Sequence, residues 1–413
     1  MCTTLMLKVP STTGQPAGPP LYVSSRAMEM PGVIEQNVYV VPKGQEFPLG
    51  QVPFLIDPPG WTSTIGFVGI AASGATWEDA PNFNDGINTA GLSVGALWLQ
   101  PGTKYPLGGD NPVSYFEFPG WILGQFSTVA ELKPALLGTN VGGSDETPPA
   151  ISVVGPLDDG VYQNYFVPLH YIVTDATGAS IIIEFVDGVI HVHDSDNGVM
   201  ANAPTYDWQK TNVDNYDHVS LVGGATHATG TAPPLGGSLV GLPGDSLSAS
   251  RFIRAWYLSQ GFGQLPPDGT GWLPAPGGET PGEGDPPGFA DPEQTAVVVA
   301  LQLVQICMGT PYGMLLEAAP KSTSDQAGAT PAAKDPPTVG DYTMWTSVRD
   351  HSNLAYYFMS AFSGILTKVD LTEIDFDSAP TYPNCNALQV LPQPGVAWCV
   401  DATTDLKPAA ALV

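Results

Sequence analysis

The sequence is poor in positive charge. Only 13 lysine and arginine residues accompany 40 aspartate and glutamate residues, and the formal net charge is −27. Nucleic acids and anionic membrane surfaces are both recognised by clusters of lysine and arginine. The composition therefore argues against both as partners. Charged residues make up only 13% of the chain, compared with about 25% in typical soluble proteins, so cations are scarce rather than acids abundant.

Long apolar runs are also missing. No segment approaches the about 18 apolar residues of a transmembrane helix, and the run 296–308 is interrupted by Gln302 and Gln305. A basic segment followed by an apolar one, as in an export signal, does not precede Cys2. We predict no membrane insertion. We expect a periplasmic or secreted protein whose signal is absent from this sequence, with a cytoplasmic location as the alternative.

Cysteine is scarce, with four residues, and none forms a Cys-x-x-Cys pair or a metal-type spacing with histidine. Cys385 and Cys399 lie close together in a loop-rich tail, where either a disulfide or two free thiols fits. Cys307 falls in an apolar run and is expected to be a small buried residue. His191 and His193 share one face of a predicted strand, but no third metal ligand is apparent, so we predict no metal.

Known cofactor and nucleophile motifs are absent as well. The sequence contains no P-loop, no dinucleotide-binding glycine motif after a strand and no His-Glu-x-x-His. It also lacks the Gly-x-Ser-x-Gly turn of serine hydrolases. These absences favour a hydrolase that needs no cofactor.

Patterning predicts strands and helices in mixed order, which suits stacked sheets between helical layers. β-Branched and aromatic runs predict strands at 3–8, 21–26, 66–72 and 91–99, a three-stranded meander at 165–194 and further strands at 342–370. Helices are expected at 113–125, 128–137, 248–260 and 292–308. Three segments read as loops: a Pro/Gly-rich insertion at about 262–292, a second loop at about 318–340 and a C-terminal tail at about 380–413.

Cys2 is the most informative residue. If Met1 is removed, Cys2 carries both a thiol and a free α-amine, so one residue can supply a nucleophile and its own general base. The alternative is an incidental buried cysteine.

Several segments, in this order, resemble the choloylglycine hydrolase family of N-terminal-nucleophile (Ntn) hydrolases, which includes penicillin V acylases and conjugated bile salt hydrolases. They are Met-Cys-Thr at 1–3, Ser-Arg-Ala-Met-Glu at 25–29, Asp-Gly-Ile-Asn-Thr-Ala-Gly-Leu at 85–92, Asn-Ala-Pro-Thr-Tyr-Asp-Trp at 202–208, the stretch 241–255, and the strand-like segments 341–348 and 355–358. The resemblance implies an α+β fold, a four-layer αββα sandwich of two stacked, mostly antiparallel sheets. It also implies a single domain over 1–413, a small-molecule amide substrate and a homo-oligomer, by family habit a tetramer.

The resemblance assigns catalytic roles to five residues. Cys2 attacks while its amine relays the proton, and Arg26 lies beside the sulfur, where a cation favours the thiolate. Glu29 orients the amine, although the family more often has Asp at this position. Asn202 donates to the oxyanion, with a turn before Pro204 as the alternative role, and Arg251 completes the site, with helix capping as its alternative.

Three further residues are candidates for substrate binding. Trp98 stands where bile salt hydrolases tend to have Asn and many penicillin V acylases have Tyr. Its backbone N–H is a candidate second oxyanion donor, and its indole either stacks on an aromatic acyl group or lies in the core. Met28 lines the same region or fills a gap in the core. Asn88 is the weakest of the three, since holding a turn explains it equally well.

These assignments predict an amide hydrolase that works through a thioester at Cys2. The Arg-x-Met-Glu form and Trp98 are most like the Gram-negative branch of penicillin V acylases. That branch implies phenoxyacetyl or fatty-acyl amides, including N-acyl homoserine lactones, as substrates. A conjugated bile salt hydrolase is the enzymatic alternative, and a secreted protein that retains the fold without catalysis is the alternative from another class.

Overall fold

The computed structural model describes residues 2–9, 19–30, 36–47, 59–72, 82–138, 149–155, 167–219, 239–263, 292–308, 315–316, 338–339, 341–360, 364–377 and 387–389. The predicted Pro/Gly-rich insertion, the second loop and the C-terminal tail lie almost entirely outside these residues. Cys385 and Cys399 do too, so their predicted pairing stays untested.

Two large antiparallel sheets form the centre of the molecule. The first, sheet A, contains in spatial order β14 (Met200–Ala201), β1 (Cys2–Val9), β2 (Leu21–Met30), β17 (Tyr342–Asp350), β18 (Ala355–Ser360) and β19 (Thr367–Asp370). The second, sheet B, contains β13 (Val189–Asp194), β12 (Ser180–Val186), β11 (Leu169–Thr174), β8 (Ser93–Trp98), β7 (Asp85–Asn88), β6 (Phe67–Ala72), β3 (Gln36–Val41) and β20 (Ala387–Gln389).

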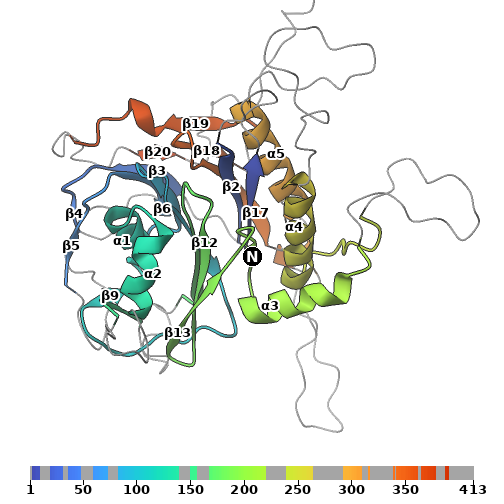
Figure 1. Cartoon of the computed structure of the whole chain (residues 1–413), viewed down its shortest axis with the longest axis horizontal. Helices are drawn as coiled ribbons and strands as arrows, with labels where there is room; N and C mark the ends of the chain where they lie inside the picture. Colours follow the sequence, from blue (N-terminus) through green and yellow to red (C-terminus); the bar gives the residue numbers. More distant parts are fainter. Residues whose placement is uncertain are drawn as a thin grey trace, which may run out of the picture.

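Helices cover the outer face of each sheet, as Figure 1 shows. Helices α4 (Ser248–Gly263) and α5 (Pro292–Ile306) pack on sheet A, and α1 (Phe118–Gln125) and α2 (Val129–Leu137) pack on sheet B. A fifth helix, α3 (Tyr206–Val213), follows β14. The predicted four-layer αββα order is confirmed.

The remaining elements of the described residues are short. Three two-stranded pairs join β4 (Glu46–Phe47) to β5 (Trp61–Thr62), β9 (Pro112–Ser114) to β10 (Ser152–Val154), and β15 (Leu315–Leu316) to β16 (Thr338–Val339). Two 3₁₀ turns span Asp214–Tyr216 and Leu371–Glu373.

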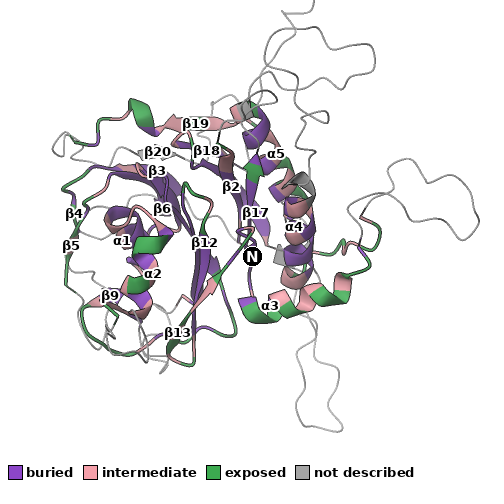
Figure 2. Cartoon of the chain, in the orientation of Figure 1, coloured by how far each residue is buried: buried purple, intermediate pink, exposed green. Residues whose placement is uncertain are grey.

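Apolar side chains fill the space between the layers, and most residues of the central strands are coloured as buried in Figure 2. One cluster lies between sheet B and helices α1 and α2. Two others join sheet A to sheet B, and one of these extends to α4 and α5. Strand β1 is buried on both faces except at Lys8, because one face meets the helices and the other meets sheet B.

Several local predictions are confirmed. The meander forms as β11, β12 and β13, and its second turn places Asp187 and Gly188 at positive φ, as a two-residue hairpin requires. Helix α2 begins at the expected place, where Thr128 accepts a hydrogen bond from the Glu131 N–H. Cys307 follows α5 and is fully buried, as predicted.

Two boundaries differ from the prediction in ways that matter. The predicted helix at 113–125 begins only at Phe118, because residues 112–114 pair with β10 as a parallel strand. Strand β2 continues to Met30, four residues beyond its predicted end. This extension places Met28 and Glu29 in the same central strand as Arg26.

Candidate active site

Strand pairing brings Cys2 and Arg26 to the same face of sheet A. Cys2 lies opposite Met28 across the β1–β2 ladder, and Thr4 lies opposite Arg26. Side chains alternate between the faces of a strand, so these four point toward sheet B, while Thr3 and Glu29 point toward the helices. Cys2 is 3% exposed.

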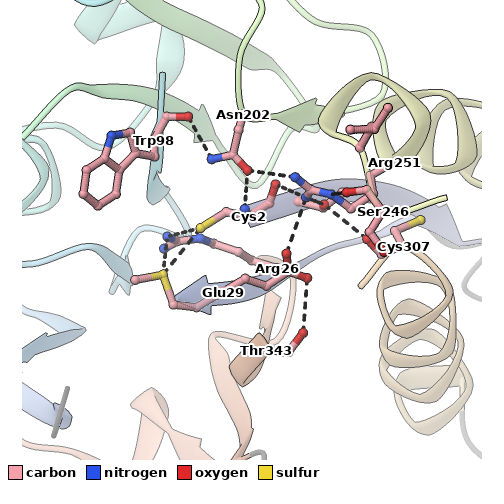
Figure 3. Close-up of polar contacts among 12 residues, drawn as sticks. Cys2, Arg26, Glu29, Trp98, Asn202, Ser246, Arg251, Cys307 and Thr343 are labelled. Atoms are coloured by element: carbon pink, nitrogen blue, oxygen red, sulfur yellow. Dashed lines mark hydrogen bonds and ion pairs between the residues drawn. The ribbon is translucent and has the colours of Figure 1, made fainter. Parts of the chain in front are cut away.

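The Cys2 sulfur has a cation and a thioether as neighbours (Figure 3). Arg26 Nη2 lies 3.7 Å from Cys2 Sγ, and Met28 Sδ lies 3.5 Å from the same sulfur. Nη2 also contacts Met28 Sδ at 3.3 Å. Met28 is half-buried, and it is therefore the more accessible side chain on this side of the sulfur. The arrangement can hold a thiolate beside a fixed positive charge.

Arg26 is fully buried, so its charge is held in the interior and not in an ion pair at the surface. Its Nη1 forms an ion pair with Asp85 Oδ2 at 3.1 Å. Burial alone would lower the pKa of Arg26, but the neighbouring Cys2 and Asp85 raise it above its usual value. The guanidinium thus stays charged next to the sulfur.

A second set of contacts fixes the backbone of Cys2. Its N–H donates to Asn202 Oδ1, and its carbonyl accepts from Arg251 Nη1 at 2.6 Å. Arg251 Nη2 donates to the same Asn202 oxygen at 2.9 Å, and Asn202 Nδ2 donates to the Trp98 carbonyl at 2.8 Å. Asn202 therefore links Cys2 to sheet B, a role that a turn residue before Pro204 would not have.

Arg251 and Glu29 lie on the helix side of sheet A. Their side chains approach to 3.8 Å, and Thr343 Oγ1 donates to Glu29 Oε1 at 3.2 Å. Burial lowers the pKa of Arg251, and the charges of Glu29 and Cys2 offset part of that change. Arg251 is buried and forms this chain of contacts, so it is more than a helix cap.

Trp98 lies at the surface rather than in the core. It is 39% exposed, and its Nε1 donates to Gln100 Oε1 at 3.2 Å. The Leu99 N–H donates to the Pro168 carbonyl, which lies on the β11 side of β8. Backbone N–H groups of successive residues in a strand point to opposite sides, so the Trp98 N–H points to the β7 side, at a level that β7 itself does not reach. The Trp98 carbonyl faces the same edge and accepts from Asn202. The backbone N–H of Trp98 and the Asn202 amide are therefore on the same side of β8.

Asn88 and Arg254 have structural contacts. Asn88 Nδ2 donates to the carbonyls of Leu123 and Phe126, and its Oδ1 accepts from the N–H groups of Ala90 and Leu92. These four bonds hold the β7–β8 turn against α1, which is the alternative role expected of Asn88, and its contact with substrate stays a prediction. Arg254 donates to the carbonyls of Pro243, Asp245 and Ile306, and these bonds tie the start of α4 to its neighbours.

Sequence reasoning missed two charged residues of the buried network. Asp85 and Arg349 are both buried and form an ion pair at 3.0 Å. Asp85 begins the family-like segment at 85–92, and that segment is the sequence feature that could have indicated it. Arg349 directly follows the family-like segment 341–348 but is not part of it.

Two features of the described residues bear on other functions. No group of three or more His, Cys, Asp or Glu side chains there has the placement needed for a metal ion. None of the helices in this part of the chain combines the length and the apolar character needed to cross a membrane.

Known proteins resemble this chain over most of its length. The model of a family described as linear amide C–N hydrolases, choloylglycine hydrolase family, matches residues 20–265. A bile salt hydrolase/transferase of Clostridium perfringens is 32% identical over 196 residues, which cover 46% of this chain and 55% of that protein. A penicillin V acylase of Pectobacterium atrosepticum is 26% identical over 399 residues, which cover 95% of this chain and 88% of that protein.

Two solved structures share the fold. A conjugated bile acid hydrolase from Clostridium perfringens has a TM-score of 0.65 at 20% identity and covers 95% of this chain and 97% of its own. A penicillin V acylase from Agrobacterium tumefaciens has a TM-score of 0.58 at 22% identity, with coverages of 91% and 88%. The Ntn-hydrolase fold implied by the sequence is thereby confirmed. The family match extends over more than half of the sequence, and this chain belongs to the choloylglycine hydrolase family of linear amide C–N hydrolases.

Proposed function

We propose that this chain is an N-terminal-nucleophile cysteine amidohydrolase whose nucleophile is Cys2. The observation that carries the proposal is the pair of contacts at Cys2, with Arg26 Nη2 at 3.7 Å from the sulfur and Asn202 Oδ1 on the backbone nitrogen. The first supplies a cation for a thiolate. The second orients the nitrogen that becomes a free amine once Met1 is removed.

The reaction proceeds in two stages. The Cys2 sulfur attacks the amide carbonyl carbon, the C–N bond breaks, and the α-ammonium of Cys2 gives its proton to the leaving amine. Water then attacks the thioester, the α-amine takes a proton from that water, and the S–C bond breaks to release the acid. Each proton that leaves the Cys2 amine in the first stage returns in the second.

The other residues act on the oxyanion and on the geometry. The second hydrogen of Asn202 Nδ2 and the backbone N–H of Trp98 are the proposed oxyanion donors. Asn202 binds the Trp98 carbonyl at the edge of β8 toward which the Trp98 N–H also points. Arg251 fixes Asn202 and the Cys2 carbonyl at once. Glu29 then acts through Arg251, by holding its guanidinium, in addition to the role in orienting the amine expected from sequence.

The proposed substrates are those of penicillin V acylases, namely phenoxyacetyl or fatty-acyl amides, with N-acyl homoserine lactones as a further group. Support comes from the match to a penicillin V acylase over 95% of this chain. It also comes from the exposed indole of Trp98, which offers an aromatic face, on a residue whose backbone carbonyl binds Asn202. Conjugated bile salts are the second candidate, because the bile salt hydrolase of Clostridium perfringens has the higher identity, over a shorter match.

A substrate panel tests the function. Protein shown by mass spectrometry to begin at Cys2 is assayed with penicillin V, a phenylacetyl analogue, a long-chain N-acyl homoserine lactone and glycocholate, and Cys2→Ala is the control. We expect penicillin V to be hydrolysed fastest and the control to be folded and inactive. Preference for glycocholate would replace the proposed substrate class. Processed protein that hydrolyses none of the amides would leave the non-catalytic alternative.

Two other predictions are tested independently of catalysis. A homotetramer predicts four times the chain mass in light scattering, and a periplasmic or secreted location predicts recovery of the protein from outside the cytoplasm of its host. A monomer, or recovery from the cytoplasm alone, would contradict them.

A further inference from the structure

Asp85 is a buried carboxylate with four donors. Its Oδ2 accepts from Arg26 Nη1 at 3.1 Å and from Arg349 Nη1 at 3.0 Å. Its Oδ1 accepts from Tyr356 OH at 2.8 Å and from Ser347 Oγ at 3.3 Å. Asp85 is fully buried, so these groups take the place of water around the carboxylate.

The carboxylate joins the two sheets at the point where the Cys2 sulfur lies between them. Asp85 belongs to β7 of sheet B, whereas its four partners belong to β2, β17 and β18 of sheet A. Gly95 is the cross-strand partner of Asp85, and a Cβ there would lie 3.3 Å from Arg349 Nη1 and 3.5 Å from Arg26 Cδ. The absence of a side chain at Gly95 gives both arginines room to reach Asp85.

The other contacts of Arg26 are with uncharged groups. Its Nη atoms also donate to the carbonyls of Asn84 and Ala96, and its guanidinium lies 5.2 Å from the centre of the Trp345 ring. Asp85 is therefore the carboxylate that anchors Arg26 within the described part of the chain. Its pull on Nη1 leaves Nη2 directed at Cys2 Sγ.

We propose that Asp85 is a positioning residue that holds the Arg26 guanidinium against the Cys2 sulfur, an inference that rests on the proposed role of Cys2 as nucleophile. Asp85 does not touch the sulfur. It acts through Arg26, and its loss reduces the reactivity of Cys2 even when the fold is intact.

A merely structural role makes a different prediction. If Asp85 only neutralises two buried arginines, removing one of the arginines together with the carboxylate restores Tm, turnover and the alkylation rate of Cys2. Asp85→Asn leaves Arg26 and Arg349 without a counter-charge. The double variant Asp85→Asn/Arg349→Met removes one charge of each sign, so its net charge equals that of the wild type while Arg26 still lacks its anchor.

The experiment compares four variants with the wild type, all starting at Cys2. They are Asp85→Asn, Arg349→Met, the double variant, and Tyr356→Phe. Tyr356→Phe is the matched control, because it removes a donor to Oδ1 and leaves the contact of Oδ2 with Arg26. Three quantities are measured for each: Tm, kcat and KM on a phenoxyacetyl amide, and the rate at which iodoacetamide alkylates Cys2. Alkylation is read on the N-terminal peptide, so that other cysteines do not contribute.

We expect Asp85→Asn to lower Tm and the double variant to recover most of that loss. In both variants we expect alkylation of Cys2 by iodoacetamide and kcat to be at least about tenfold slower than in the wild type, with KM within about twofold. The reason is that a displaced Arg26 no longer holds its positive charge beside the sulfur. Arg349→Met and Tyr356→Phe are expected to stay within about threefold of the wild type in both rates.

A double variant with wild-type alkylation and turnover would overturn the proposal and leave Asp85 as a charge-balancing residue. If Asp85→Asn does not fold, the comparison of the double variant with Arg349→Met decides, because these two differ only at residue 85. Alkylation needs no amide substrate. A wild type that hydrolyses no amide would refute the proposed function while the alkylation rates still test Asp85.

Discussion

Replacing Asn202 by aspartate separates the two tasks assigned to its side chain. The carboxylate keeps an acceptor for the Cys2 nitrogen and for Arg251 Nη2, which lies 2.9 Å from Oδ1. It removes the Nδ2 donor, which now contacts the Trp98 carbonyl at 2.8 Å. Asn202→Asp therefore tests the oxyanion role without removing the acceptor that orders Cys2.

The expected loss follows from these contacts. Removing one oxyanion donor typically lowers kcat by about 10²–10³, or about 2.7–4 kcal/mol of transition-state stabilisation. The stability of the fold should change little, because the ion pair gained with Arg251 offsets the repulsion between the new carboxylate oxygen and the Trp98 carbonyl oxygen. Asn202→Ala leaves the Cys2 N–H and Arg251 Nη2 without their acceptor, so it should lose both kcat and about 2–4 kcal/mol of unfolding free energy.

The assay combines steady-state kinetics on a phenoxyacetyl amide with denaturant unfolding. Asn88→Asp is the matched control, since Asn88 makes four backbone hydrogen bonds in a turn. We expect it to lower stability and to leave kcat within about threefold of the wild type. An Asn202→Asp variant that also keeps kcat within about threefold would refute the oxyanion assignment.

Three more predictions concern groups around the site. Trp98→Ala should raise KM for a phenoxyacetyl amide by about two- to twelvefold and leave kcat unchanged, because only the indole contact is lost; an unchanged KM would exclude the indole from binding. Burial raises the pKa of Glu117 to about 7, so the unfolding free energy should fall as pH rises from about 4.5 through 7. Glu117→Gln should therefore raise the unfolding free energy by up to about 3 kcal/mol at pH 8 but not at pH 4. Equal effects at both pH values in denaturant titrations would contradict this. Burial lowers the pKa of His351 to about 4, so the unfolding free energy should fall by up to about 3 kcal/mol as pH drops from about 6.5 through 4. His351→Gln should flatten that pH dependence in the same titrations. A variant with the pH profile of the wild type would refute this prediction.

The sequence predicts the residues of the site where each lies in a recognisable motif. Cys2, Arg26, Asn202 and Arg251 are chosen by their motifs, and the structure brings all four together. The face each one occupies was harder to foresee. Residues 27–30 lack β-branched side chains, so the sequence pattern ends the strand too early. The pattern therefore does not indicate that strand alternation places Arg26 and Glu29 on opposite faces.

Contacts between the sheets were beyond sequence reasoning. The Asp85 network joins positions 59 and 264 residues apart, and it depends on which strands face one another across the interior. Trp98 shows the same limit. Its hydrophobic neighbours on β8 suggest a core residue as readily as a surface one, and its exposure of 39% is evident only in the structure.

The most direct test of the account is the chemical state of the first residue during turnover. Processed protein is mixed with excess phenoxyacetyl amide and quenched in acid within a fraction of a second, and the N-terminal peptide is analysed by mass spectrometry. The account predicts an acyl group on Cys2 Sγ together with a free α-amine. An acyl group on another residue, or full turnover by a chain that still carries Met1, would contradict it.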